Sequence, residues 1–246
     1  MKKVIKWIGL SVITILVFIL YSGTYFDIPR EVLESKYATG ASQFLNLNDG
    51  SRIHYRDEGN VQGPVIVLLH GFNASLFNFE KLVPLLTEDF RLVSLDLPAF
   101  GLTGAVPSAD YTTENFVRTV SELTHYLGID RFSIAGNSMG GHVAWRYALQ
   151  YPDQIQGLIL IAAGGVITEE DLERLDQQEN DSPIVWELMD SNLARKILLF
   201  FTPRFFAEQG LKTAVADPKL VTEELVSQFH DLALLDGSRE AILSMI

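Results

Sequence analysis

Short apolar runs alternate with a helical pattern through the middle of the chain. Four such runs are apolar on both faces, at residues 64–69, 92–95, 132–135 and 158–161, as expected for parallel strands covered on both sides. Between two of them, residues 113–127 carry one apolar stripe with a 3.6-residue period, formed by Phe116, Val120, Leu123 and Leu127. This alternation predicts an α/β fold with a mostly parallel sheet wrapped by helices.

Two further strands precede this region. Residues 44–47 and 52–56 flank the sequence Asn-Asp-Gly-Ser, and an Asp-Gly pair between two strands is a strong hairpin signal. Residues 27–41 contain Pro29 and Gly40 without a clear period, which predicts a linker. We therefore place the start of the folded domain at residue 42 and extend it to residue 246.

The regular pattern stops after Ala163. Residues 164–237 contain helical patches and two prolines, and a segment this long between strands predicts an inserted helical cap. Such a cap would cover the carboxyl edge of the sheet, where α/β folds bind ligands. Its aromatic residues at 200–206 either line a substrate pocket or only pack the cap. Residues 221–235 predict one of its helices, and Ser238 begins another.

The N-terminus carries a long apolar segment. Lys2, Lys3 and Lys6 precede twenty uncharged residues, 7–26, and a helix of that length spans about 30 Å, the thickness of the hydrocarbon core of a bilayer. The basic flank would stay cytoplasmic, which places the domain on the other side. We predict a membrane anchor over residues 1–26 and an extracytoplasmic domain. A cleaved signal peptide, leading to secretion, is the alternative.

Composition excludes several classes of function. The chain has 246 residues, 48% of them hydrophobic, and a formal charge of −12, which argues against disorder and against nucleic-acid binding. It has no cysteine, so disulfides and zinc–thiolate sites are excluded. The acidic segment 169–190 has helical spacing, not the spacing of a metal-binding loop. No metal or cofactor is predicted, and the sequence does not indicate an oligomeric state.

One motif indicates chemistry directly. The strand at 132–135 runs into Gly136-Asn137-Ser138-Met139-Gly140 and then into a helical pattern, which is typical of a serine nucleophile on a tight strand-to-helix turn. Side chains at positions 136 and 140 would collide with the neighbouring strand and helix. The turn exposes the hydroxyl of Ser138 at a helix N-terminus, where the Met139 N–H can face a developing oxyanion.

A second motif supplies the other half of this site. His70-Gly71-Phe72 directly follows the buried strand at 64–69. Gly71 allows the backbone to turn so that the Phe72 N–H faces the same point as the Met139 N–H. We expect His70 to tether this loop by side-chain hydrogen bonds and not to act as a base.

These residues resemble the α/β-hydrolase fold family. The resemblance rests on three motifs, at residues 70–75, 95–104 and 136–141 (H-G-F-N-A-S, L-D-L-P-A-F-G-L-T-G and G-N-S-M-G-G), and covers about residues 42–246. It implies that Ser138 is the nucleophile and that the N–H groups of Phe72 and Met139 form the oxyanion hole. It also implies that Asp96 belongs to a structural turn and not to a catalytic triad.

The end of the chain departs from the family pattern. In this family the nucleophile is followed along the chain by an acid and then by a histidine. After Ser138 the sequence has only His142, on the helix behind the nucleophile, and His230, in a predicted cap helix. By resemblance two further strand–helix units would follow, about 60 residues at about 30 per unit. We therefore interpret the sequence as truncated at its C-terminal end.

The sequence predicts a membrane-anchored serine hydrolase that acts on carboxylic esters or related apolar acyl substrates. The motif G-N-S-M-G-G also resembles the nucleophile motif of carbon–carbon bond hydrolases that act on ring-cleavage products. Such a hydrolase is one alternative. A non-catalytic, hydrolase-like binding protein is another, should the chain be complete. A serine at position 138, where an aspartate would stand, argues against haloalkane dehalogenase and epoxide hydrolase chemistry.

Overall fold

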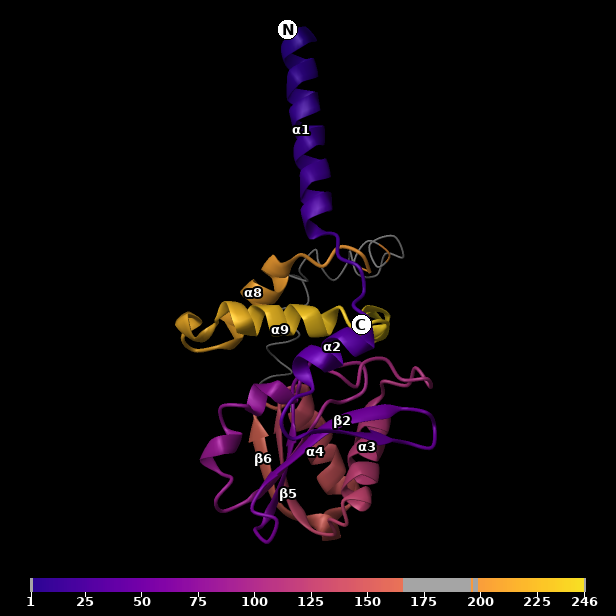
Figure 1. The fold of residues 1–246 in the computed structure, drawn as a ribbon, viewed down its shortest axis with the longest axis vertical. Helices are drawn as coiled ribbons and strands as arrows, with labels where there is room; N and C mark the ends of the chain where they lie inside the picture. Colours follow the sequence, from indigo (N-terminus) through magenta and orange to yellow (C-terminus); the bar gives the residue numbers. More distant parts are fainter. Residues whose placement is uncertain (1, 166–195, 197–198, 246) are drawn as a thin grey trace, which may run out of the picture. The chain divides into compact units, whose positions relative to one another are not determined.

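The computed structural model describes residues 2–165, 196 and 199–245 (Figure 1). The chain divides into two compact units. The sheet unit comprises Ile28–Ser182 and Leu235–Ile246, and the helical unit comprises Met1–Asp27 and Pro183–Leu234. The acidic segment 169–190 and much of the predicted cap lie outside the described residues. The cap therefore stays a prediction.

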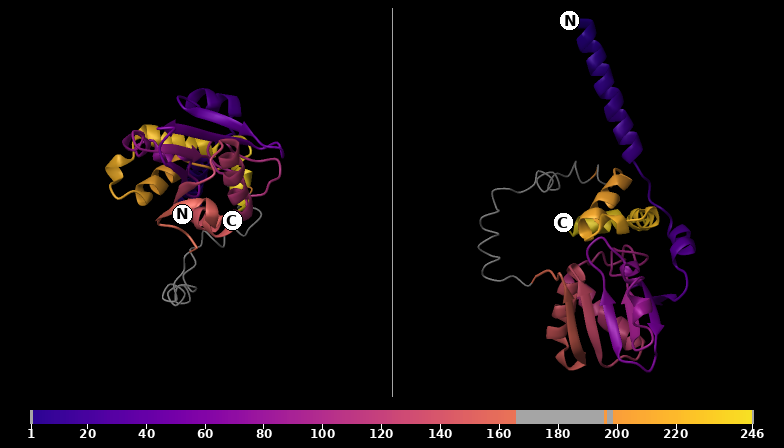
Figure 2. Two further views of the ribbon diagram at one scale, coloured as in Figure 1. Left: turned by 90° about the horizontal axis from the view of Figure 1, so that it is seen from below. Right: turned by 90° about the vertical axis from the view of Figure 1, so that its left-hand side faces the viewer.

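A six-stranded sheet forms the centre of the sheet unit, in the order β1-β2-β4-β3-β5-β6. Its strands are β1 (Ser42–Asn46), β2 (Arg52–Gly59), β3 (Val65–Leu69), β4 (Arg91–Leu95), β5 (Phe132–Asn137) and β6 (Ile155–Ile161). β1 and β2 form the predicted hairpin, and β2 also pairs antiparallel with β4. The remaining pairs are parallel, which confirms the mostly parallel sheet (Figure 2).

Two longer helices cover one face of the sheet, α3 (Thr113–Tyr126) and α4 (Met139–Gln150) (Figure 1). The side chain of Thr112 caps the first of them by accepting a hydrogen bond from the Asn115 N–H, which satisfies one unpaired donor of the first turn. Phe116, Val120 and Leu123 of the predicted stripe are buried in the main core between these helices and the sheet.

The opposite face is covered by two short 3-10 helices, η1 (Leu76–Phe79) and η2 (Val83–Leu85). They contribute Phe79 and Val83 to a second, smaller core against Leu68 and Leu92. Alternate residues of β3 and β4 therefore belong to different cores. This explains why both strands are apolar on both faces.

The last strand of the sheet differs from the prediction. Residues 158–161 form part of β6, but each is between 40% and 46% exposed, whereas the last four residues of β3 are buried. β6 pairs only with β5 among the described residues. The apolar pattern identified the strand correctly, but burial also depends on neighbours that the pattern does not show.

The sheet unit also contains the 3-10 helix η3 (Pro152–Gln154) and two short α-helices. Helix α2 (Arg30–Tyr37) lies inside the predicted linker and buries Leu33, while the guanidinium of Arg30 donates hydrogen bonds to the carbonyl groups of Leu102 and Thr103. Helix α10 (Ser238–Ser244) contributes Ala241 to the main core. Because α2 buries a single side chain, no periodic stripe indicated it.

The helical unit contains α1 (Lys2–Gly23), α8 (Arg204–Ala214), η5 (Pro218–Leu220) and α9 (Glu223–Ala233). After α1 the chain runs beside residues 200–202, with hydrogen bonds of 2.9 Å from the Tyr25 N–H to the Phe200 carbonyl and from the Thr202 N–H to the Gly23 carbonyl. The predicted helix at 221–235 is present as α9, which the side chain of Thr222 caps.

The predicted membrane anchor is wrong. Across the described residues, no helix combines the length and hydropathy that a membrane crossing requires. Helix α1 ends at Gly23, whereas the uncharged run continues to residue 26. The prediction of an extracytoplasmic location, which rested on this anchor, is overturned with it.

Candidate active site

Ser138 lies on the turn between β5 and α4 with φ of 50° and ψ of −115°. We call residues 136–141 the nucleophile turn. A non-glycine residue at positive φ is strained, and its surroundings must hold it there. The Ser138 N–H donates to the Ile161 carbonyl at 2.9 Å, and the Ser138 carbonyl accepts from the N–H groups of His142 and Gly164 at 3.1 and 3.0 Å. These contacts fix the backbone while the residue stays exposed.

The two motif glycines are required by close backbone contact. A Cβ atom on Gly136 would lie 2.2 Å from the carbonyl oxygen of Gly140, and one on Gly140 would lie 2.3 Å from the carbonyl oxygen of Leu69. No side chain fits at such distances, because the colliding atoms belong to the backbone. The steric reason that the sequence suggested for both glycines is therefore present in the structure.

The segment after β3 lies against the nucleophile turn. We call residues 70–76 the oxyanion loop. A Cβ atom on Gly71 would lie 3.0 Å from Oδ1 of Asn137 and 3.3 Å from Cβ of Ser138, so the structure brings the two predicted motifs together. Neither the Phe72 N–H nor the Met139 N–H has a hydrogen-bond acceptor among the described residues. Both donors are available to a ligand.

His70 is occupied by the backbone on both ring nitrogens. Its Nδ1 lies 2.7 Å from the Gly71 carbonyl and its Nε2 lies 3.0 Å from the Leu97 N–H. The carbonyl can only accept and the N–H can only donate, so the proton sits on Nδ1. The ring is fully buried, and burial lowers the pKa of His70. This geometry fits the predicted tether and leaves no nitrogen for Ser138.

Asp96 follows β4 and is buried inside the sheet unit. Its Oδ1 accepts a hydrogen bond from the Leu76 N–H at 2.7 Å. Its Oδ2 accepts from the Leu102 N–H at 2.8 Å and lies 2.7 Å from Nδ1 of His54. A Cβ atom on Gly101 would overlap the same carboxylate at 2.1 Å. Asp96 thus fixes local backbone, in agreement with its expected structural role.

The charge of Asp96 is stabilised despite burial. Burial raises the pKa of this carboxyl, but the His54 ring and the Leu76 N–H outweigh burial and hold the pKa below its usual range. Sequence reasoning missed His54, which contacts Asp96 from β2. A histidine inside a strand carries no motif, so no local signal could have found it.

No described side chain is hydrogen-bonded to the hydroxyl of Ser138. His142 is half-buried and packs its ring against Trp145, with centroids 4.8 Å apart. In the helical unit, Nε2 of His230 donates to the Thr202 carbonyl at 2.8 Å. His125 is exposed on α3. The described residues also include no group of three or more side chains able to hold a metal ion.

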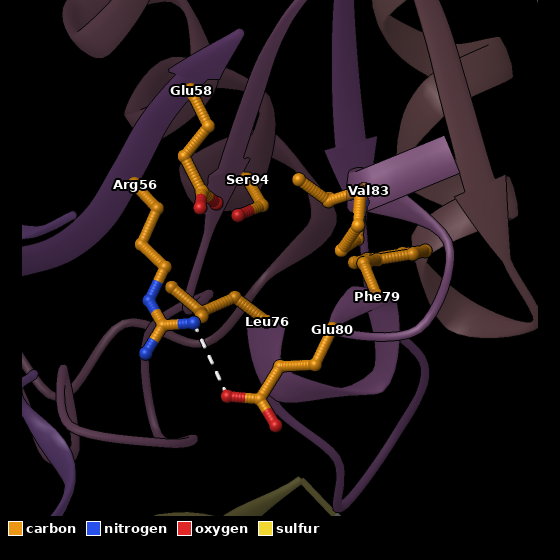
Figure 3. Close-up of a pocket in the computed structure, with 8 residues that line it drawn as sticks. Arg56, Glu58, Leu76, Phe79, Glu80, Val83 and Ser94 are labelled. Carbon is orange, nitrogen blue, oxygen red and sulfur yellow. Dashed lines mark hydrogen bonds and ion pairs between the residues drawn. The ribbon is translucent and has the colours of Figure 1, made fainter. Parts of the chain in front are cut away.

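A pocket lies on the face of the sheet that η1 and η2 cover (Figure 3). Its volume is about 320 Å³, and it is lined by Arg56, Glu58, Leu76, Phe79, Glu80, Val83, Pro84 and Ser94. Figure 3 shows the guanidinium of Arg56 directed at the carboxylate of Glu80, with 3.2 Å between them. None of the residues predicted for the active site lines it, so we do not assign the chemistry of Ser138 to this pocket.

The fold and the site together define the class of protein. The chain matches the family model described as the alpha/beta hydrolase fold over residues 64–214. It belongs to this family, as the sequence motifs predicted.

Relatives within the family have different reactions in their names. The chain is 27% identical to Lipase 1 of Psychrobacter immobilis over 80% of this chain and 62% of the lipase. It is 32% identical to 2-hydroxy-6-oxononadienedioate/2-hydroxy-6-oxononatrienedioate hydrolase of Klebsiella pneumoniae over 50% of this chain and 45% of that protein. The crystal structure of Cfl2 from Burkholderia cenocepacia is similar with a TM-score of 0.64 and 25% identity, over 82% of this chain and 69% of Cfl2. The chain spans about half the length of the curated relatives that it matches.

Proposed function

We propose that the protein is a serine hydrolase of carboxylic esters or related acyl substrates, with Ser138 as its nucleophile. The backbone of Ser138 supports this most strongly, because it is held at a φ of 50° on a strand-to-helix turn. Such a conformation costs about 1–3 kcal/mol and clusters at sites where strain serves a function. In this conformation Ser138 is exposed, next to the unpaired N–H groups of Phe72 and Met139.

In the proposed reaction, Oγ of Ser138 attacks the acyl carbonyl and forms a tetrahedral intermediate. The N–H groups of Phe72 and Met139 would donate to its oxyanion, and the positive end of the α4 dipole would stabilise the same charge. The alcohol then leaves, and water hydrolyses the acyl-enzyme to release the acid. The serine proton must pass to a base, and we assign this role to no described residue.

An apolar substrate fits the surface beside these donors. The side chain of Phe72 is 44% exposed and contacts Phe100 edge-on, with ring centroids 5.5 Å apart. An exposed aromatic ring next to the oxyanion donors can pack against the acyl chain of a substrate. The similarity to a lipase supports the same choice of a small apolar ester.

Carbon–carbon bond hydrolysis is the second candidate. It is favoured by the 32% identity to the Klebsiella pneumoniae hydrolase and by the sequence G-N-S-M-G-G of the nucleophile turn. Both reactions would use the same serine and the same oxyanion donors. The substrate separates them: an ester hydrolase releases nitrophenolate from p-nitrophenyl butyrate, whereas the alternative cleaves a 2-hydroxy-6-oxo-dienoate.

A fluorophosphonate probe tests the nucleophile. Full-length protein should be labelled at Ser138, and Ser138→Ala should not be labelled, because the probe forms its bond with an activated serine hydroxyl. Ser108→Ala is the matched control, since Ser108 is an exposed loop serine and its loss should leave labelling unchanged. Peptide mass spectrometry identifies the labelled residue.

Two outcomes would contradict the proposal. Equal labelling of the wild type and Ser138→Ala would show that the probe reacts elsewhere. No labelling of either protein, with both folded by circular dichroism, would favour the hydrolase-like binding protein over the enzyme. A histidine that accepts the serine proton would be present in both the wild type and Ser138→Ala. It would therefore not affect the comparison of their labelling.

A further inference from the structure

We propose that His54 is a positioning residue for the oxyanion loop and acts on it through Asp96. The proposal rests on the proposed function, because it assigns the loop its catalytic purpose. His54 lies on β2, far from both motifs in the sequence, and no motif includes it. Four structural observations lead to this role.

First, side-chain hydrogen bonds link the oxyanion loop to the turn after β4, which contains Asp96 and Leu97. His70, at the start of the oxyanion loop, accepts a hydrogen bond from the Leu97 N–H at 3.0 Å. Asp96, just before Leu97, accepts one from the Leu76 N–H at the end of the loop at 2.7 Å. The loop is therefore held at both ends, and Phe72 lies between the two attachment points.

Second, His54 fixes the direction of the Asp96 carboxylate. Both side chains are completely buried, and Nδ1 of His54 lies 2.7 Å from Oδ2 of Asp96. The Leu102 N–H donates to the same oxygen at 2.8 Å. Two donors on Oδ2 prevent the carboxylate from rotating, and Oδ1 is left to face the Leu76 N–H.

Third, the tautomer of His54 follows from its surroundings. Nε2 of His54 is buried and has no hydrogen-bond partner, and the ring packs near Phe44 and Phe77, with centroids 5.1 and 5.9 Å away. A proton on Nε2 would have no acceptor, and an unsatisfied buried donor costs about 1–3 kcal/mol. The proton therefore belongs on Nδ1, where it is donated to Asp96.

Fourth, the backbone of His54 is tied to the same turn. Its N–H donates to Oγ1 of Thr103 at 2.9 Å, and its carbonyl accepts from the Asp96 N–H at 2.9 Å. The Thr103 hydroxyl in turn donates to the Asp96 carbonyl at 2.8 Å. The ring therefore has a fixed base from which to orient the carboxylate.

Oxyanion donors act only when they lie within about 2.7–3.1 Å of the developing charge. When the His54 donor is lost, the carboxylate can turn, the Leu76 bond lengthens and the Phe72 N–H moves. Because removing one donor outright costs about 10²–10³ in rate, we expect misplacing it to slow Ser138 labelling by about 10-fold to 100-fold.

The test compares two substitutions in the full chain. His54→Leu replaces the imidazole donor by an apolar side chain of similar size. His54→Asn instead provides an amide N–H at the position of Nδ1. The rate of fluorophosphonate labelling should fall in His54→Leu and return to within about 3-fold of the wild type in His54→Asn. Ile53→Val is the matched control, since Ile53 is buried in the same strand and its side chain carries no hydrogen-bonding group.

Amide hydrogen exchange gives a readout that does not depend on the enzyme proposal. The Leu76 N–H should exchange faster in His54→Leu than in the wild type and slow again in His54→Asn, while Ile53→Val leaves it unchanged. If Ser138 never reacts but Leu76 exchange follows this order, the function fails and the positioning role stands. Unchanged Leu76 exchange in His54→Leu, or no recovery in His54→Asn, would overturn the role of His54.

One measurement needs only the wild type and covers the case in which His54→Leu does not fold. In proton NMR, the Nδ1–H of His54 should give a slowly exchanging imidazole signal. This proton should show a nuclear Overhauser effect to the Leu76 N–H. A ring that instead carries its proton on Nε2 would contradict the proposal.

Discussion

The nucleophile turn and the oxyanion loop meet at one site but are held by different forces. In the nucleophile turn, backbone packs directly on backbone, with Gly140 against the carbonyl oxygen of Leu69. The oxyanion loop is held by buried side chains, with His70 and Asp96 binding backbone N–H groups at its two ends. One segment depends on the absence of side chains and the other on their presence.

This difference determines what each segment tolerates. The contacts of the two glycines in the nucleophile turn are steric, so an added methyl group there has no space at any pH. The oxyanion loop depends on hydrogen bonds to one carboxylate, so it responds to the loss of a donor or of a charge. The two segments should therefore fail under different substitutions, which the following variants examine.

Gly136→Ala should have the largest effect. The new Cβ would lie 2.2 Å from the Gly140 carbonyl oxygen and 2.5 Å from the Gly141 nitrogen, and neither atom can move without breaking the turn. We expect a loss of at least about 4 kcal/mol in the free energy of unfolding, among the largest effects of single substitutions. Urea denaturation followed by circular dichroism measures it.

Gly128→Ala is the matched control for this comparison. Gly128 has a positive φ of 65°, which Gly136 does not, and a Cβ atom there meets nothing within 4 Å. It should cost only the backbone strain, about 1 kcal/mol. Equal losses in Gly128→Ala and Gly136→Ala would contradict the large cost that we assign to backbone overlap at Gly136.

Asp96→Asn should have the next largest effect and should act on the oxyanion loop. It removes the charge that accepts three hydrogen bonds and turns an amide donor toward N–H groups, for a loss of about 2–4 kcal/mol near pH 7. Asp153→Asn, at an exposed position, is the control and should change stability by less than about 0.5 kcal/mol.

The same variant gives a pH dependence with a fixed sign. The folded pKa of Asp96 lies below its usual range, so its charge stabilises the fold above the unfolded value of about 3.9. That contribution is lost as the pH falls through the folded pKa. The stability difference between wild type and Asp96→Asn should therefore shrink below about pH 4. A constant difference down to pH 2 would contradict the role of this charge.

The sequence predicted those parts of the site that depend on local contacts. The collision of Gly136 with Gly140 involves residues four apart in the chain, and the strand-turn-helix pattern around Ser138 implies it. The order of β3, the His70 loop, α3 and β5 followed from apolar runs and one helical stripe. These features are encoded within short windows, so a single sequence is enough to find them.

Contacts between distant strands could not be predicted in this way. His54 meets Asp96 because β2 pairs antiparallel with β4, with Tyr55 opposite Leu95, and no sequence pattern gives that register. The exposure of residues 158–161 likewise depends on which strands flank β6. At the N-terminus, helix α1 ends at Gly23, where the chain runs beside residues 200–202, and the uncharged run does not indicate that neighbour.

Ala99→Gly should have the smallest effect and separates strain that serves the site from strain that does not. Ala99 has a φ of 81° in the turn that Asp96 and His70 hold, and glycine removes a cost of about 1–3 kcal/mol there. Lost methyl burial, about 0.8 kcal/mol, and a more flexible unfolded chain, about 0.4–1 kcal/mol, offset most of this gain. We expect a net stabilisation of about 0.5–1 kcal/mol, measured by urea denaturation, with Ser138 labelling unchanged. Ala135→Gly, the same change at a buried position in a strand, should instead destabilise by about 1.5 kcal/mol. If Ala99→Gly slowed labelling, the strain at Ala99 would belong to the site, as we propose for the strain at Ser138.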